Sequence, residues 1–470
     1  PSTIDGQFDH AERRAVQYFL DWSSRKPGLL GLPQDRSTFA DLLTVGGVGF
    51  ALPTYAIAAQ RSWITRSDAI ARTLPTLRLL GDSSLFGPQP TGTVGYRGFF
   101  NHFFGIDGRR KRNFDHPSTV AHEGLNAVEL STIDTALALM GVLAAQSYFS
   151  GASADESEIR RLAQEIFDRV DWPFMLAGNQ QFFLGWLPNE PRQGPPFEIP
   201  DADGRGAYSG TPAVPATLDF YTDEAFLVTL LAVGSMTHPV PTSVHCAWKR
   251  LEYFGDGLIR TFPGSAFTYQ FLHAFLDSRT LNFPPCPGEP PFRPYDNSRQ
   301  ALLTLFRYAL GQRAAYTTYG PGGWGLSACE GPDDQYRAYG APPIALQPHP
   351  PEDGTVTYYG ALSSASFGSD LMALCARVLQ LAWLRGHVHA RFGLPDAFND
   401  EIAQGAVNPV GGSNSSILRR QGQWVQRALF SIDQGPMALA LENARTGFVW
   451  KLLGSNPNIQ RAIARLRESR

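Results

Sequence analysis

Apolar residues recur at steps of three and four along almost the whole chain, and this helical period limits its fold more than any other feature. Strand-like alternation is brief, at 355–359, and neither a βαβ rhythm nor a Gly-rich phosphate-binding motif precedes a helix. The sequence therefore predicts an all-α protein and argues against a nucleotide-binding sheet. The periodic segments are 11–22, 50–63, 67–80, 132–149, 156–170, 222–233, 299–312, 369–385, 421–432 and 459–466.

The chain has 470 residues, of which 43% are hydrophobic, so it is long enough for one large core or for several ordinary domains. Two Pro-rich stretches, 191–215 and 282–294, lie between helices of the same character and are interpreted as long rim loops. We expect a single domain over residues 1–470. At least ten helices in one domain favour an α/α toroid of about twelve helices, in which the N-termini of the inner helices meet at one mouth.

Charge and hydropathy exclude several classes of protein. The net charge is -3 and the densest basic run is the short segment 109–112, which argues against nucleic-acid binding. The sequence has no apolar run of about 18 residues, so no membrane span is expected. We expect a periplasmic or secreted protein if a signal peptide was removed before Pro1, and a cytoplasmic one otherwise. The oligomeric state is left open.

The four cysteines, Cys246, Cys286, Cys329 and Cys375, are widely spaced and form no CxxC pattern. This spacing predicts free or buried thiols, with one disulfide in an oxidising compartment as the alternative. Histidine, cysteine and acidic residues form no cluster with the spacing of metal ligands, so neither a metal nor another cofactor is expected.

Carboxylates stand at the start of two apolar helical runs. Glu129 and Asp134 open the first run, where Ser131 or Thr132 is the expected cap, and Glu224 opens the second after Thr222. Acids in a first helical turn are often simple capping groups that the helix dipole favours. Here the surrounding loops are rich in Trp, Tyr, His and Arg, so we interpret the three acids as the candidate catalytic group of a carbohydrate-cleaving enzyme.

Aromatic rings interleaved with acids, histidine and arginine predict the substrate site. Apolar faces of pyranose rings stack on aromatic side chains, while sugar hydroxyls take directional hydrogen bonds. For any single ring, ordinary packing is the competing explanation. The candidate substrate-binding residues are His102, Trp186, His273, Asp277, Arg279, Trp324, Glu330, Asp334, Tyr336 and Tyr339.

Three motifs in order resemble the glucoamylase-like family: 129–143, 324–343 and 432–447. This family includes the endo-β-1,2-glucanases of glycoside hydrolase family 144 and the central domain of cyclic β-1,2-glucan synthases. The resemblance covers nearly the whole chain. It implies an (α/α)6 barrel that acts on an oligo- or polysaccharide with β-1,2 linkages.

The chain departs from the glucanase pattern at one place. Where that branch has an Asp-x-x-Glu pair, this chain has Ser131 and Asp134, whereas the later Glu is retained as Glu224. The segment beginning at Glu129 is closer to the synthase branch, which resembles a retaining transglycosylase. The resemblance thus implies Glu224 as nucleophile or general base and Glu129 or Asp134 as acid. It favours retention with transfer to a sugar acceptor, with hydrolysis and inversion as the alternative, because family 144 hydrolases are inverting and the shorter Asp134 would widen the gap between the carboxyl groups.

Two alternatives remain open: a barrel glycosidase specific for another glycan, and a catalytically silent glycan-binding protein. Two further acids in the third motif, Asp433 and Glu442, either contact sugar or are structural. In the structural case Glu442 is expected to pair with Arg445, three residues later on the same helix.

Overall fold

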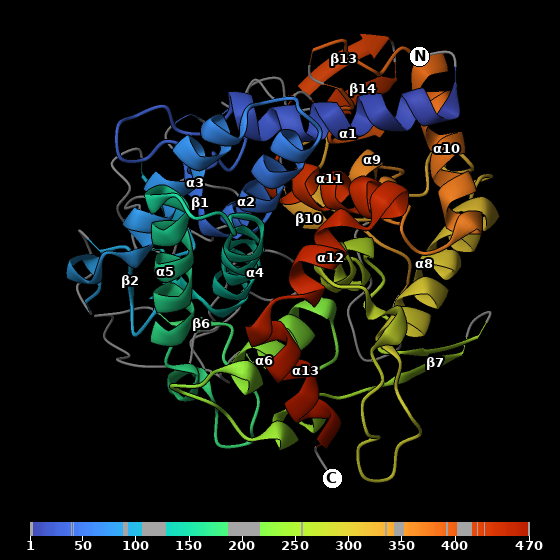
Figure 1. Cartoon of the computed structure of the whole chain (residues 1–470). Coiled ribbons are helices and arrows are strands. Elements are labelled where there is room, and N and C mark those ends of the chain that lie inside the picture. Colours follow the sequence, from blue (N-terminus) through green and yellow to red (C-terminus); the bar gives the residue numbers. More distant parts are fainter. Residues whose placement is uncertain are drawn as a thin grey trace.

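The computed structural model describes residues 3–38, 40, 42–87, 93–105, 128–186, 217–254, 257–333, 336–342, 352–391, 393–401, 416–420, 422–426 and 428–468. Within these residues the chain forms thirteen α-helices and several small sheets (Figure 1). The main cluster of buried hydrophobic side chains extends from Phe8 to Leu466. None of the described helices is both long and apolar enough to cross a membrane.

Six helices form a closed inner ring. Neighbouring members contact one another around the ring, and the step from α7 to α9 runs through the short 3-10 helix η4, Ala266–Tyr269. These helices are hydrophobic on nearly all sides; α2 buries every residue from Val45 to Ala58. The ring consists of α2 (Val45–Gln60), α4 (Thr132–Tyr148), α6 (Asp223–Gly234), α7 (Phe271–Phe275), α9 (Tyr358–Leu362) and α11 (Ser431–Thr446).

Outer helices cover this ring and bury only one stripe each. In α5 the buried residues include Ile159, Leu162, Ala163 and Ile166, a spacing of three and four residues that turns one helix face inward. The outer helices are α1 (Ile4–Asp21), α3 (Arg66–Gly81), α5 (Ala154–Arg169), α8 (Pro294–Gly311), α10 (Ser369–Leu384) and α13 (Pro457–Glu468), with α12 (Phe448–Gly454) between α11 and α13. The two layers make an α/α barrel, as predicted.

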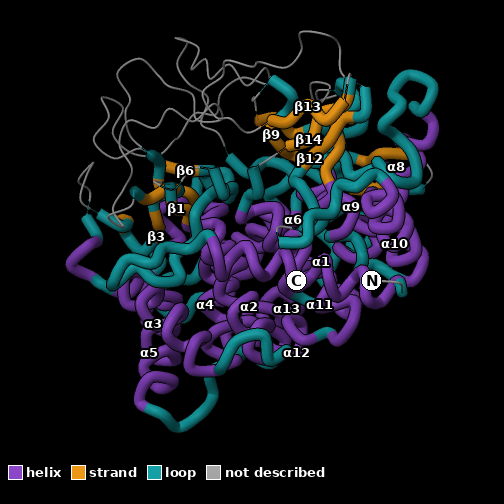
Figure 2. The backbone as a smooth tube through the Cα atoms, turned by 90° about the horizontal axis from the view of Figure 1, so that it is seen from above, coloured by secondary structure: helices purple, strands orange, loops and turns teal. Residues whose placement is uncertain are grey.

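Short strands mark one end of the barrel. Four of them, β1 (Leu43–Thr44), β5 (Leu130–Ser131), β11 (Val356–Thr357) and β14 (Gln423–Gln426), precede the inner helices α2, α4, α9 and α11. The labelled strands lie on one side of the helices (Figure 2). This side is therefore the mouth at which inner-helix N-termini gather. The other strands are β2 (Gly95–Tyr96), β3 (Phe99–Phe100), β4 (Phe103–Phe104), β6 (Gly185–Trp186), β7 (Glu252–Phe254), β8 (Leu258–Arg260), β9 (Ala328–Glu330), β10 (Tyr336–Ala338), β12 (Ala397–Asn399) and β13 (Ser416–Arg420).

All the sheets within the described part of the chain are antiparallel. The largest has four strands in the order β11-β12-β14-β13, and the others pair β1 with β4, β2 with β3, β5 with β6, β7 with β8 and β9 with β10. In the pair β5–β6, Leu130 lies opposite Trp186 and Ser131 opposite Gly185. This pairing fixes the chain at the entry of α4.

Helices α2 and α4 approach each other closely because glycines lie between them. A Cβ atom on Gly49 would lie 2.2 Å from the carbonyl oxygen of Leu137, and one on Gly46 would lie 2.2 Å from Oδ1 of Asp134. Any side chain at these positions would force the helices apart. The two glycines thus place the first turn of α4 directly against the start of α2.

The periodic segments match helices with one exception. Segment 421–432 contains the strand β14 and only the beginning of α11, which starts at Ser431. Gly422 has a φ of 85°, so the chain turns there into the hairpin of β13 and β14. The prediction of a helix was wrong at this place because its few apolar residues fit both periods. The helices α7 and α9 have five residues each, too short for a period to be seen.

The expectation of free thiols was wrong for two cysteines. Cys246 and Cys286 form a disulfide between residues 40 apart in the sequence, while Cys329 and Cys375 are free and buried. Pairing depends on which loops meet in space, and spacing alone does not reveal it. His245 brings a third ligand atom close to the two sulfurs, but these sulfurs are bonded to each other.

We expect loss of this disulfide to lower the free energy of unfolding by about 2 to 4 kcal/mol, because the cross-link restricts the unfolded chain. The measurement is urea denaturation of wild type and of the Cys246→Ser/Cys286→Ser variant, each with and without a reductant. Reductant should lower the wild-type midpoint to that of the variant and leave the variant unchanged. Equal midpoints of the unreduced proteins would contradict the stabilising role.

Candidate active site

A cavity of about 270 Å³ lies at the mouth of the barrel, at the N-terminal ends of α4, α6 and α11. Among the described residues, four carboxyl groups line it, from Glu129, Asp134, Glu224 and Asp433. The other lining residues are His102, Ser131, Ile133, Leu137, Leu184, Phe267, Phe271, Tyr336, Tyr359 and Ile432. The cavity thus combines acids with aromatic rings, as a carbohydrate site requires.

Local capping places two of these acids. Ser131 caps α4: its hydroxyl accepts a hydrogen bond from the backbone N–H of Asp134 at 3.1 Å and donates one to Oδ2 of Asp134 at 2.5 Å. Thr222 caps α6 in the same way, through the N–H of Ala225 at 3.1 Å. Asp134 and Glu224 therefore both stand in first helical turns, where the dipole favours negative charge.

His102 bridges two of the carboxylates. Its Nδ1 lies 2.7 Å from Oε1 of Glu129 and its Nε2 lies 3.4 Å from Oδ2 of Asp134. The ring stacks on Phe103, with centroids 3.8 Å apart. Burial alone lowers the pKa of His102, but Asp134 and Glu129 outweigh it and raise this pKa to about 9. At neutral pH the imidazolium thus offsets part of the negative charge of its two neighbours.

Glu224 lines the same cavity, and its pKa is raised. Burial raises the pKa of Glu224 to about 8, and the negative charge of Asp134 contributes to the increase. Burial also raises the pKa of Asp134, while His102 and the Ser131 hydroxyl act in the opposite direction. Glu224 therefore favours its protonated form at neutral pH. The net effect on Asp134 is also a raised pKa, although the His102 cation and the Ser131 hydroxyl favour its ionised form against the effect of burial.

Asp433 lies at the start of α11, 1% exposed, and its Oδ2 has no hydrogen-bond partner among the described residues. Burial raises the pKa of Asp433 well above the ordinary value, and the adjacent carboxyl of Asp396 raises it further. Burial likewise raises the pKa of Asp396 to about 7. These two groups form a second acidic pair beside the cavity, of which only Asp433 lines it.

Comparison with known proteins assigns the chain to a family. A model of the glycoamylase family, whose description is "Putative glucoamylase", matches residues 218–457, just over half of the chain. The chain belongs to this family. The matched region begins just before α6 and runs to the start of α13, so it includes Glu224 and Asp433.

Similar proteins share the fold over the full length of the chain. The structure of an endo-β-1,2-glucanase from Chitinophaga pinensis, in complex with sophorotriose and glucose, has a TM-score of 0.75 at 18% identity and covers 99% of each chain. A β-1,2-glucanase from Parabacteroides distasonis has a TM-score of 0.73 at 18% identity, covering 100% of this chain and 61% of that one.

A curated relative, an exo-β-1,2-glucooligosaccharide sophorohydrolase that acts at the non-reducing end, also comes from Parabacteroides distasonis. It is 21% identical over 503 aligned residues, which cover 99% of this chain. This chain spans 58% of the length of that relative.

The cavity brings together five of the residues singled out from the sequence: His102, Glu129, Asp134, Glu224 and Tyr336. Asp334 lies outside the described residues. Sequence reasoning weighed Asp433 but did not place it in the site, although it repeats the pattern of an acid in the first turn of an inner helix. It also missed Phe267, Phe271 and Tyr359, whose orientation depends on the packing of separate helices.

Several predicted sugar-binding residues are instead buried in the protein away from the cavity lining. Trp324 is 1% exposed and packs edge-on against Phe306. Tyr339 is fully buried, and its hydroxyl donates to Asp353 at 3.1 Å. The remaining ones are Trp186 (7% exposed, against Tyr96), His273 (1%, behind α6) and Glu330 (1%, paired with Arg36).

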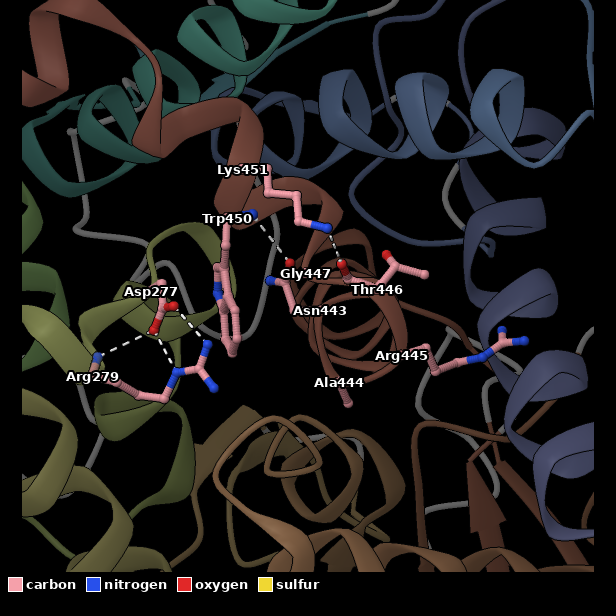
Figure 3. A pocket seen from close by; sticks show the side chains of 9 residues that line it. All are labelled: Asp277, Arg279, Asn443, Ala444, Arg445, Thr446, Gly447, Trp450 and Lys451. Carbon is pink, nitrogen blue, oxygen red and sulfur yellow. Dashed lines mark hydrogen bonds and ion pairs between the residues drawn. The ribbon is translucent and has the colours of Figure 1, made fainter.

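Asp277 and Arg279 line a second cavity, of about 350 Å³, at the C-terminal end of α11 (Figure 3). Because α11 begins at the first cavity and ends at the second, the two groups of residues cannot contact the same sugar unit. Arg279 is paired with Asp277 at 2.6 Å, and its guanidinium lies 4.8 Å from the ring centroid of Trp450. The side chains of Arg279 and Asp277 are 53% and 33% exposed at this second cavity, so sugar binding by Asp277 and Arg279 there stays a prediction.

The expected pair of Glu442 with Arg445 was wrong. Glu442 binds Arg61 at 2.7 Å, whereas Arg445 binds Glu12 at 2.5 Å and Asp9 at 3.0 Å. Each ion pair joins α11 to another helix of the barrel: Arg61 caps the C-terminal end of α2, and Asp9 and Glu12 belong to α1. Glu442 itself is buried, with 1% exposure. Of the two weighed alternatives for Glu442, the structure favours the structural one.

Proposed function

We propose that this chain is a glycosidase of one barrel domain that hydrolyses β-1,2-linked glucans or glucooligosaccharides. One observation carries the proposal: Glu224, half-buried and with its pKa raised to about 8, lines the same aromatic cavity as the His102-bridged carboxyl groups of Glu129 and Asp134. Two carboxyl groups in different protonation states are what glycoside hydrolysis requires. The linkage is proposed from the named activities of the relatives, because a shared fold at this level of identity does not by itself fix the substrate.

In the proposed reaction Glu224 donates its proton to the glycosidic oxygen as the bond from this oxygen to the anomeric carbon breaks. Asp134 accepts a proton from a water molecule whose oxygen forms the new bond to the anomeric carbon. The products are two sugars with free hydroxyl groups, and one water is consumed. These roles are the reverse of those expected from the sequence, because burial keeps Glu224 protonated. A sugar hydroxyl in place of water would give transfer with inversion, whereas the retaining transfer expected from the sequence requires a carboxylate that attacks the anomeric carbon and forms a covalent intermediate.

His102 serves this mechanism by holding Glu129 and Asp134 in place and by favouring the ionised form of Asp134. Comparison of Glu129→Gln, Asp134→Asn and Asp433→Asn identifies the base. We expect Asp134→Asn to lose the most turnover, since Asp134 is the carboxylate that affects the pKa of Glu224. A larger loss in Asp433→Asn would assign the base to α11 instead.

The pH dependence of kcat/KM follows from the proton on Glu224. We expect kcat/KM to fall as the pH rises through about 8, because Glu224 then loses the proton that it must donate. The sign is opposite to that for a catalytic carboxylate base, which limits activity on the acid side. Initial rates between pH 5 and 10, at substrate concentrations far below KM, measure this limb. A rate constant independent of pH up to 10 would contradict Glu224 as the acid.

A panel of defined glucans tests the function itself. The chain is incubated with β-1,2-, β-1,3-, β-1,4- and α-1,4-linked glucans, and products are separated by chromatography. We expect products from the β-1,2-linked substrate alone. Preferred cleavage of another linkage would establish a different glycosidase, and binding without cleavage would establish a silent binding protein. NMR of the first-formed anomer shows retention if it is β and inversion if it is α.

A further inference from the structure

Behind Glu224 lies a buried polar cluster that the proposed reaction does not use. Asp223 and Glu224 are consecutive residues in the first turn of α6, and their side chains point in different directions around the helix. Glu224 lines the cavity, whereas Asp223 is fully buried. A buried carboxyl group is costly unless its oxygens are hydrogen-bonded, so the contacts of Asp223 must hold it in one place.

Those contacts come from three different segments. The Tyr221 hydroxyl donates to Oδ1 of Asp223 at 2.9 Å, and the backbone N–H of Leu272 donates to Oδ2 at 3.2 Å. Nε2 of His273 lies 3.5 Å from Oδ2, and the hydroxyl of Ser298 lies 3.5 Å from Oδ1. Asp223 thereby ties the first turn of α6 to α7 and α8.

The same cluster also holds a second part of the cavity lining. Phe271, the first residue of α7, lines the cavity directly before Leu272 and His273. His273 is held in turn, because its Nδ1 contacts the Ser278 hydroxyl and its carbonyl oxygen accepts from Nε1 of Trp450 at 2.7 Å. Burial lowers the pKa of His273 to about 3, so its ring is neutral. Displacement of Asp223 would therefore move Glu224 and Phe271 relative to each other.

We propose that Asp223, held by Tyr221 and by the start of α7, is a positioning residue that fixes the direction in which Glu224 enters the cavity. The proposal rests on the proposed function of Glu224 as the proton donor. A catalytic group must stay within a fraction of an ångström of its productive position, and a shift of about 1 Å costs up to about 100-fold in rate. The cluster acts through Glu224 and does not touch the reacting sugar.

The test uses Tyr221→Phe, which removes one donor to Asp223 and keeps the ring that packs on Phe292. We expect kcat to fall about 10- to 100-fold with little change in KM. The carboxyl pKa of Glu224, followed by ¹³C NMR without substrate, should move downward, since a less restrained side chain reaches more solvent. Its signal is assigned as the one that is lost in Glu224→Gln. Asp223→Asn should have the same effects if it folds.

Tyr55→Phe is the matched control. Tyr55 is also fully buried and also loses its hydrogen bonds, to Ser23 and to the carbonyl oxygen of Gly31, both at 2.8 Å. The Tyr55→Phe variant should be less stable than wild type, but its kcat and the pKa of its Glu224 should be unchanged. Unchanged kcat in Tyr221→Phe, or a loss without a pKa shift, would overturn the positioning role. Absence of any glucan cleavage by wild type would instead overturn the proposed function, while the NMR measurement would still report on the cluster.

Discussion

Glu224→Gln is expected to lower kcat by about 10²- to 10⁴-fold, the usual contribution of a general acid. Glutamine has nearly the same shape but no proton of suitable acidity to donate to the leaving oxygen. Burial raises the pKa of Glu224 to about 8, so the folded protein favours its uncharged form, and a neutral amide fits the same place. We therefore expect an unchanged or slightly higher melting temperature, measured by calorimetry alongside the steady-state rates.

The competing explanation for Glu224 is simple stabilisation of the start of α6, and the matched control is the true cap, Thr222. Thr222→Ala removes the acceptor for the N–H of Ala225 and should cost about 0.5 to 2 kcal/mol of stability. A Glu224→Gln variant with a lower melting temperature and wild-type cleavage would show that Glu224 only stabilises the start of α6.

Arg36→Met is expected to lower the free energy of unfolding by about 3 to 5 kcal/mol, because it leaves a buried carboxylate without its counter-charge. The Arg36 side chain is 6% exposed and pairs with Asp35 and with Glu330, whose side chain is 1% exposed. Gln426 also donates to Glu330, at 3.1 Å. This network joins the segment after α1 to β9 and to the four-stranded sheet, so chemical denaturation should show the loss directly.

The double variant Arg36→Met/Glu330→Gln removes both charges and should recover most of the loss. An exposed pair provides the comparison: Arg161→Met breaks the contact of Arg161 with Glu165, whose side chains are 56% and 48% exposed, and should change stability by about 0.5 kcal/mol or less. Equal stability of the buried and the exposed variants would show that the buried network contributes no more to folding than a surface ion pair does. Activity lost without loss of stability would instead support the sugar-binding role predicted for Glu330.

The helical class and the approximate bounds of most helices follow from the sequence alone. The outer helices show their one buried stripe as a period of three and four, and Ser131 and Thr222 mark helix starts through their hydroxyl groups. These signals are local, since they depend on the chain within about one or two helical turns. The acids at the beginning of α4 and α6 belong to the same class, so the local pattern is sufficient to identify Asp134 and Glu224 as candidates.

Tertiary structure decided which predicted residues belong together. Glu224 lies in the first turn of the inner helix α6 and Asp277 lies just after the inner helix α7, yet Asp277 lines the cavity at the far end of α11. Cys246 and Cys286 pair across residues 40 apart, and Asp223 is buried while its neighbour Glu224 faces the cavity. Side-chain direction, burial and the resulting pKa values depend on contacts between segments far apart in the chain. A local pattern carries no information about those contacts, which is why the sequence located the acids but assigned their roles in reverse of those proposed here.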